Sequence, residues 1–143
     1  MANYYPPTGF HFKVEFNEFK SEVMFQSVSG LNVELETEEL AEGGENRFKH
    51  RLPVRTKFSN LVLNRGLLTD SKITDWVTDA VLHFDIKLTD LTIKLLDENH
   101  EPLVTWNVVN AYPVKWALSD LNAEESKLMI ETLELSYNYF NKI

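Results

Sequence analysis

The segment from Ser29 to Gly66 separates its charges by sign, and this constrains the fold more than any other stretch of the chain. Its first half carries six acids and no base, its second half carries six bases and no acid, and the hinge between them is Glu42-Gly43-Gly44-Glu45-Asn46. Adjacent glycines adopt positive φ without steric cost, so they mark a turn or a hairpin tip. Like charges on one strand repel unless an opposite surface lies nearby. We therefore predict two limbs that pair with each other, or with the limbs of another copy.

Both limbs alternate apolar and charged residues with a period of two, which is typical of half-buried strands. The alternation predicts that the acids share one face of a strand and that the bases share one face of the next. Pro53 lacks a backbone donor, so we expect the basic strand to be an edge or to be interrupted there. The candidate residues for contacts between subunits are Glu34, Glu36, Glu38, Glu39, Glu42, Gly43, Gly44, Glu45, Asn46, Arg47, Lys49, Arg51 and Arg55.

The same period recurs along most of the chain, and only one segment has helical periodicity. Apolar residues at Ile73, Trp76, Val77, Ala80 and Val81 form one stripe of a helix at about 71–83. That stripe is expected to pack within the subunit, after a cap at 69 or 70. Further strands are expected at 10–16, 23–28, 61–63, 91–95, 103–112, 114–118 and 132–139.

This order of elements predicts a mainly β fold: an antiparallel β-sandwich or small barrel with one flanking α-helix. The length of 143 residues suits one domain, 1–143, with an extended leader at 1–9 and a protruding loop at 40–48. The residues expected to anchor the core are Phe12, Val14, Trp76, Val77 and Trp106.

Composition excludes several classes of site. The chain has no cysteine, which excludes disulfides and thiolate metal sites. A net charge of −8 argues against a general nucleic-acid binder. The first residues lack a signal peptide's basic and apolar regions, and no apolar run reaches the ~20 residues of a membrane helix. We therefore expect folding in the cytoplasm and no membrane anchor.

Motifs for catalysis are weak. The four histidines lack metal-ligand spacing, and no glycine-rich phosphate loop is present. Glu34 with Glu36, or Asp97 with Glu98, could be read as the paired carboxylates of a carbohydrate hydrolase, which would have to face one sugar in a pocket. A solvated or protein-facing acidic surface is the better interpretation. We expect no catalytic, cofactor-binding or metal site, and hence no enzyme.

A set of short motifs resembles a known family, and their order and spacing are more specific than any single one. The motifs are Val28-Ser29-Gly30-Leu31 followed by Glu34 and Glu36, Glu42-Gly43-Gly44-Glu45-Asn46, Leu52-Pro53, Asn60-Leu61, Asn64-Arg65-Gly66, Leu95-Leu96-Asp97-Glu98, Trp106, Asn110-Ala111-Tyr112-Pro113-Val114-Lys115-Trp116, Asn122-Ala123-Glu124-Glu125 and the strand from Ile130 to Tyr137. With them the chain resembles the tail-tube proteins of contractile phage tails and of phage-tail-like contractile injection systems. Val54 departs from the pattern, because many relatives are expected to have glycine after the proline.

The resemblance implies a structural subunit, related in fold to type VI secretion tube proteins. Such subunits join their sheets into hexameric rings, which stack into a tube inside a sheath. The implied partners are further copies, the sheath protein, baseplate and tube-terminator proteins, and protein cargo or DNA in the lumen. The particle would be a phage tail or an extracellular phage-tail-like particle. The loop at 40–48 would then make the axial contact. The alternatives are a baseplate-proximal tube initiator or a cargo adaptor of the same fold, and an enzyme built on a β-sandwich.

Overall fold

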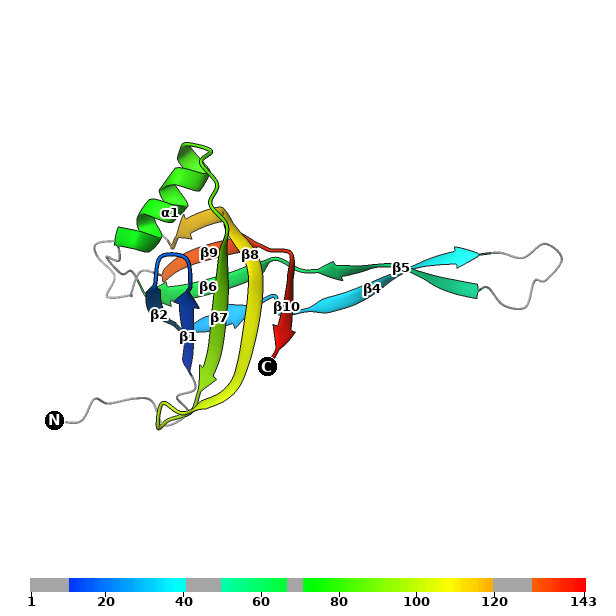
Figure 1. The fold of residues 1–143 in the computed structure, drawn as a ribbon, viewed down its shortest axis with the longest axis horizontal. Helices are drawn as coiled ribbons and strands as arrows, with labels where there is room; N and C mark the ends of the chain where they lie inside the picture. The colour runs from blue at the N-terminus through cyan, green and yellow to red at the C-terminus, as the bar shows by residue number, and fades with distance from the viewer. Residues whose placement is uncertain (1–10, 41–49, 67–70, 120–129) are drawn as a thin grey trace.

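The computed structural model describes residues 11–40, 50–66, 71–119 and 130–143. Within these ranges the chain forms strands and one helix, and the strands dominate (Figure 1). The elements are, in chain order, β1 (His11–Phe16), β2 (Ser21–Phe25), β3 (Ser27–Ser29), β4 (Val33–Leu40), β5 (His50–Phe58), β6 (Leu61–Gly66), α1 (Ser71–Leu82), β7 (Thr89–Leu96), β8 (Pro102–Leu118), β9 (Ile130–Ser136) and β10 (Tyr139–Lys142).

The body is a single antiparallel sheet that folds over on itself, in the order β2-β1-β7-β8-β9-β6-β3. The 17-residue strand β8 belongs to both halves. Its first half pairs with β7 and β10, and its second half pairs with β9. We call β2, β1, β7, the first half of β8 and β10 the front sheet, and the second half of β8 with β9, β6 and β3 the back sheet. The mainly antiparallel β fold with one helix is therefore confirmed, and it is a sandwich rather than a closed barrel.

A bend in β8 produces the two halves. Asn110 has a φ of 56°, in the left-handed region that asparagine tolerates better than most residues. A bulge follows between Pro113 and Lys115, where the register with β9 shifts. Bulges bend a strand and increase its twist. The strands expected at 103–112 and 114–118 are therefore one long strand, with Pro113 beside the bulge.

The core lies between the two halves and beneath the helix. Alternate residues of the strands point inward and are buried, as the period of two requires. Among the expected anchors, Val14, Trp76 and Val77 are buried, whereas Phe12 and Trp106 are partly buried at the rim. Because each layer buries only one face, the outer face of the front sheet is exposed, and it carries charged residues such as Lys13 and Glu22 beside the exposed apolar Met24.

Helix α1 covers one end of the sandwich with the stripe that its spacing predicts (Figure 1). Ile73, Trp76, Val77 and Ala80 are buried, but Val81 is 45% exposed, so its expected packing is corrected. Val81 is the second-last residue of α1, and the next residue, Leu82, is exposed as well. The cap positions at 69 and 70 lie outside the described residues.

Two other strand predictions change in detail. The strand expected at 23–28 is divided into β2 and β3, which lie at the two ends of the folded sheet, one in its front half and one in its back half. At the junction the Gln26 N–H donates to the Asn64 carbonyl of β6, 2.8 Å away. The last expected strand is likewise divided into β9 and β10, which both follow β8 in one continuous register. Both changes follow from the folding of one sheet into two halves.

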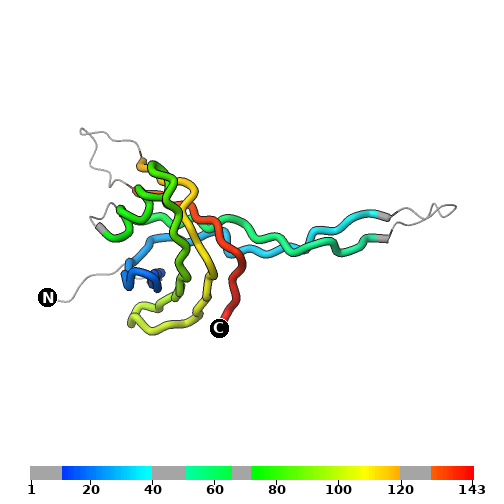
Figure 2. The backbone as a smooth tube through the Cα atoms, turned by 45° about the horizontal axis from the view of Figure 1, so that its top comes forward, coloured from blue at the N-terminus to red at the C-terminus, as the bar shows by residue number. Residues whose placement is uncertain are grey.

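Strands β4 and β5 form a two-stranded ribbon that pairs with no other strand of the described chain. We call this ribbon the arm. It projects away from the body in both views of the backbone (Figures 1 and 2). The loop predicted at 40–48 would lie at its end; Leu40 is the last residue of β4, and the rest of that loop is outside the described residues.

Candidate assembly interface

The arm carries the segregated charges, and part of that charge is satisfied within the subunit. Glu36 lies directly opposite Arg55 in the register, and the Arg55 Nε to Glu36 Oε2 distance is 3.0 Å. Glu39 lies opposite Arg51, with Arg51 Nη2 3.7 Å from Glu39 Oε1. Both arginine side chains are 71% exposed. The acidic and basic limbs therefore pair with each other within the subunit, as one of the two predicted alternatives requires. Most of each arginine side chain nevertheless remains exposed to another molecule.

The predicted single basic face is wrong. The register between β4 and β5 shifts by one residue next to Thr37, which lies opposite Pro53 while Glu36 lies opposite Arg55. Val54 is the additional residue, so β5 has a bulge where Pro53 lacks a backbone donor. Since a shift of one residue exchanges the faces of a strand, Arg51 and Arg55 lie on opposite faces. The expected interruption at Pro53 is confirmed.

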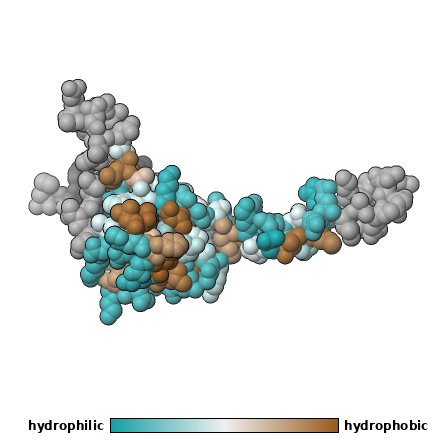
Figure 3. Space-filling view, turned by 90° about the horizontal axis from the view of Figure 1, so that it is seen from above, coloured by the Kyte–Doolittle hydropathy of each residue, from teal (hydrophilic) through white to brown (hydrophobic). Residues whose placement is uncertain are grey.

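Exposed apolar side chains lie between the charges of the arm. Val33, Leu35, Leu52 and Val54 are each about half exposed, and Leu35 reaches 58%. Figure 3 shows this mixture of apolar and hydrophilic surface along the arm. A two-stranded ribbon is marginally stable by itself and cannot bury such side chains. Leu52 lies opposite Glu38 and Leu35 opposite Thr56, so both faces of the ribbon carry exposed apolar side chains that a neighbouring molecule could cover. The charge pattern predicted the arm as a contact surface, and the exposed apolar side chains belong to the same surface.

The base of the arm is held by the body. Phe58 makes an edge contact with Phe140, with ring centroids 5.4 Å apart, and another with Tyr137 at 6.0 Å. The Tyr137 hydroxyl donates to the Gly30 carbonyl at 3.3 Å. Burial raises the pKa of Tyr137 to about 12, so the hydroxyl remains a donor throughout the physiological range.

Gly30 allows the chain to enter the arm. Its φ is +94°, and a Cβ at this position would overlap the backbone carbonyl of Asn60. Only glycine adopts this conformation beside another backbone without strain. The Ser59 N–H also donates to the Asn32 carbonyl at 3.3 Å, which links the residue before β4 to the residue after β5. The direction of the arm is therefore set by packing and hydrogen bonds at its base.

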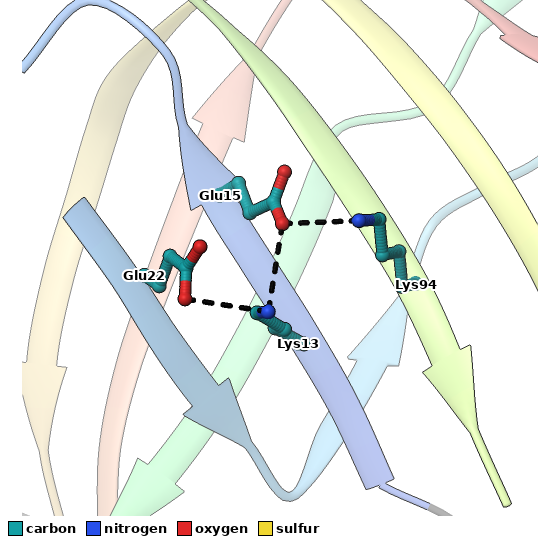
Figure 4. A network of polar contacts seen from close by, with 4 residues as sticks. All are labelled: Lys13, Glu15, Glu22 and Lys94. Carbon is teal, nitrogen blue, oxygen red and sulfur yellow. Dashed lines mark hydrogen bonds and ion pairs between the residues drawn. The ribbon is translucent and has the colours of Figure 1, made fainter. Parts of the chain in front are cut away.

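The second polar surface is the outer face of the front sheet. Lys13 of β1 lies between two carboxylates, 3.6 Å from Glu15 and 3.3 Å from Glu22 of β2 (Figure 4). Lys94 of β7 donates to the same Glu15 oxygen at 3.1 Å. The four charges sum to zero and spread across three strands. The alternation of these strands can be seen in the sequence, but this network cannot, because it depends on which strands are neighbours.

The structure places the remaining candidates as follows. Glu34 lies opposite Lys57 and Glu38 lies opposite Leu52, both in the arm. The other predicted contact residues, Glu42, Gly43, Gly44, Glu45, Asn46, Arg47 and Lys49, lie outside the described residues.

Two of the carboxylates considered for catalysis, Asp97 and Glu36, hold the local structure together. Asp97 Oδ1 accepts hydrogen bonds from the backbone N–H groups of Asn99 and Glu101, at 2.8 and 2.9 Å, and so closes the turn between β7 and β8. Glu36 is paired within the arm. Among the described residues no group of three or more potential ligands could hold a metal ion. In the same part of the chain, no helix is long and apolar enough to cross a bilayer.

Comparisons with known proteins agree with one another. The family model of the T4-like virus tail tube protein gp19 matches residues 8–141. A chain in the cryo-EM structure of the anti-feeding prophage (AFP) baseplate, 6-fold symmetrised, is 30% identical; the match covers 100% of this chain and 97% of that one, with a TM-score of 0.81. A chain in the sheath-tube complex of PVC, an extracellular contractile injection system in its extended state, is 26% identical over 97% and 92% of the two chains, with a TM-score of 0.79.

One more distant structure shares the fold. Hcp1 from Flavobacterium johnsoniae is 15% identical, over 93% of this chain and 94% of that one, with a TM-score of 0.63. No curated protein sequence matches the chain.

Proposed function

The chain belongs to the family of the T4-like virus tail tube protein gp19, and on this premise we propose that it is the main subunit of the inner tube of a contractile injection system. Copies form hexameric rings, the rings stack within a sheath, and the lumen conducts protein cargo or DNA. The family is one of structural proteins, which supports a role in assembly rather than catalysis. The subunit assembles in the cytoplasm and becomes part of a phage-tail-like particle.

The observation that carries this proposal is the arm. A ribbon that projects from the body has too little surface contact with its own subunit to bury Leu35 or Leu52. It is nevertheless anchored at its base by Phe58 and Gly30, as a preorganised contact requires. Stacked rings need a second, non-closing contact in addition to the one that closes each ring. The arm, with the loop beyond it, is suited to reach a subunit of the adjacent ring.

Trimming the arm tests this assignment. We expect a variant with Asn-Gly in place of residues 37–54 to fold, because Glu36 and Arg55 are directly opposite and accept a two-residue turn. Electron microscopy of the purified variant should show monomers or single rings, whereas the unchanged protein grows tubes. Glu98→Ala, in an exposed turn of the body, is the control and should leave tube growth unchanged. Long tubes from the trimmed variant would contradict the role of the arm.

A charge-swap experiment separates pairing within the arm from pairing between subunits. Arg55→Glu opposes Glu36 with a like charge, so it disturbs both kinds of contact. The double variant Glu36→Arg with Arg55→Glu restores the pair within the arm but presents reversed charges to a neighbour. We expect assembly to stay impaired in the double variant. A change of about 1 kcal/mol per contact raises the concentration needed for assembly roughly five-fold. Light scattering during assembly measures this concentration. Every copy carries both substitutions, so full recovery in the double variant would show that Glu36 and Arg55 pair only with each other and meet no other charge of a neighbour.

A second candidate function is that of a ring at the baseplate end of the tube. The observation that supports this role is sequence identity. The chain is 30% identical to a chain in the AFP baseplate structure and 26% identical to a chain in the PVC sheath-tube complex. An initiator should stop at one ring even at high concentration, whereas a main tube subunit should form long tubes. Negative-stain microscopy across a concentration series distinguishes the two.

A further inference from the structure

The end of helix α1 and the segment after it expose five apolar side chains within eight residues. Each is 42–80% exposed, and they are Val81, Leu82, Phe84, Ile86 and Leu88. Single exposed apolar side chains are ordinary on a protein surface, whereas a cluster bordered by charged residues is typical of an interaction site. We call these five residues the apolar knob. Figure 3 looks onto the side of the body that carries α1 in Figure 1, and apolar surface is gathered there.

Phe84 has a backbone conformation that bulky residues rarely adopt. Its φ is 53°, in the left-handed region, and its side chain is 80% exposed. The N–H groups of His83 and Asp85 on either side both donate to the Asp79 carbonyl, at 3.2 and 2.8 Å. Glycine is the usual left-handed residue where a helix ends. Phe84 therefore costs the isolated subunit free energy and gains little packing in return, which indicates a role outside the subunit.

Hydrogen bonds fix the knob to the body. Trp76, a buried residue of α1, donates its Nε1–H to the Lys87 carbonyl at 2.7 Å. Together with the two bonds to Asp79, this contact holds the backbone on both sides of Phe84. A surface that is already ordered loses little conformational freedom on binding. The knob is thus a preorganised surface, as the arm is at its base.

One face of the arm is apolar and complements the knob. Val33 and Leu35 are two residues apart on β4, so they share a face, and they are 55% and 58% exposed. Thr56 lies opposite Leu35, and Arg51 lies opposite Glu39 on the same face. The other acids of β4 alternate with these residues and lie on the opposite face. We call Val33, Leu35 and Thr56 the apolar face of the arm.

The charges beside the two surfaces are opposite in sign. Asp85 lies within the knob; its ion pair with Lys87 is long, at 3.9 Å, and its side chain is 59% exposed. Arg51 is 71% exposed and is 3.7 Å from Glu39. Exposed pairs of this kind are weak. Asp85 and Arg51 can therefore exchange partners and pair across an interface between two copies.

The arm cannot meet the knob of its own subunit, because it projects from the body on the side away from α1 (Figures 1 and 2). A contact between two knobs would be isologous and would end at two copies. A contact between an arm and a knob is heterologous, so every added copy leaves one arm and one knob free. Growth of an assembly requires a contact of the second kind.

We propose that the apolar knob is the docking site for the arm of a second copy, with Leu35 against Phe84 and Arg51 beside Asp85. This inference rests on the proposed function, because it names the surface that the arm of a tube subunit meets.

Phe84→Gly separates a role in docking from a role within the subunit. Glycine adopts the positive φ without strain and the lost side chain is exposed, so the isolated variant should melt at the same temperature or higher. The concentration needed for tube growth should rise about ten-fold or more, because each docked arm loses a buried ring. Met24→Ser, which removes an exposed apolar side chain of β2, is the control and should change neither value. Unchanged tube growth by Phe84→Gly would overturn the proposal.

The absence of cysteine makes a cross-linking test specific. One preparation carries Leu35→Cys or Thr56→Cys and an affinity tag, and a second carries Leu82→Cys or Ile86→Cys without a tag. Disulfides form only where the two Cα atoms lie about 4.4–6.8 Å apart. After mixed assembly and mild oxidation, we expect at least one combination to give a heterodimer on a non-reducing gel. Glu98→Cys in the untagged chain, in an exposed turn, is the matched control and should give none.

The outcomes separate this inference from the proposed function. If rings or tubes form but no combination links more than the control, the arm docks elsewhere, and the proposed function stands. If the unchanged protein forms neither rings nor tubes, the proposed function fails and this inference fails with it.

Discussion

Arg65→Met is expected to lower the free energy of unfolding of the isolated subunit by about 3–5 kcal/mol, because it leaves a buried carboxylate without its partner. Arg65 Nε and Nη2 donate to the same Glu131 oxygen, at 2.9 and 2.6 Å. Both side chains are almost completely buried, at 2% and 6% exposure. The guanidinium also lies 5.4 Å from the centre of the Phe25 ring. Urea unfolding under conditions that prevent assembly measures the loss.

The double variant Arg65→Met with Glu131→Leu distinguishes the value of the pair from the cost of breaking it. Buried ion pairs gain little over apolar residues of similar volume, because both ions must leave water. We therefore expect the double variant to recover most of the stability that the single variant loses. A double variant as unstable as Arg65→Met would show instead that the pair itself stabilises the fold. Arg65 and Glu131 lie directly opposite in β6 and β9, so their pairing also favours the native register.

Trp76→Ala is the second large expected effect, a loss of about 3–5 kcal/mol. The indole is 6% exposed and meets Phe16 edge-on at 5.7 Å and Phe19 at 5.5 Å. Its Nε1–H donates to the Lys87 carbonyl at 2.7 Å, which ties the segment after α1 back to the helix. Removing the ring leaves a cavity between the helix and β1. Thermal unfolding followed by circular dichroism should show a lower midpoint and a smaller yield of folded subunit.

Trp76→Phe is the matched control for this prediction. It keeps most of the apolar volume and removes the hydrogen bond to Lys87, so we expect a smaller loss of about 1–3 kcal/mol. An unchanged midpoint in Trp76→Ala would contradict the role of this side chain as an anchor between α1 and the front sheet.

The outline of the fold could be predicted from neighbouring residues alone. Side chains of a strand alternate between faces, so the spacing of Val14 and Phe16, or of Leu133 and Leu135, indicated strands and their buried sides. The spacing of Ile73, Trp76 and Val77 indicated the helix in the same way. The charge pattern also identified the arm as a candidate contact surface. These predictions succeed because the direction of a side chain depends on local backbone geometry.

Only the tertiary structure determines which side chains far apart in the sequence contact each other. Nothing local joins Arg65 to Glu131, or Glu15 to Lys94, because these contacts depend on which strands are neighbours and in which register. The bulge at Val54 reversed the predicted face of Arg51, since one additional residue exchanges the sides of a strand. Val81 continues the helical stripe yet is 45% exposed, because spacing along a helix does not determine which positions another part of the fold covers. Spacing along the chain determines the direction of each side chain, whereas the neighbour that it meets depends on how the strands pair and how far each layer extends.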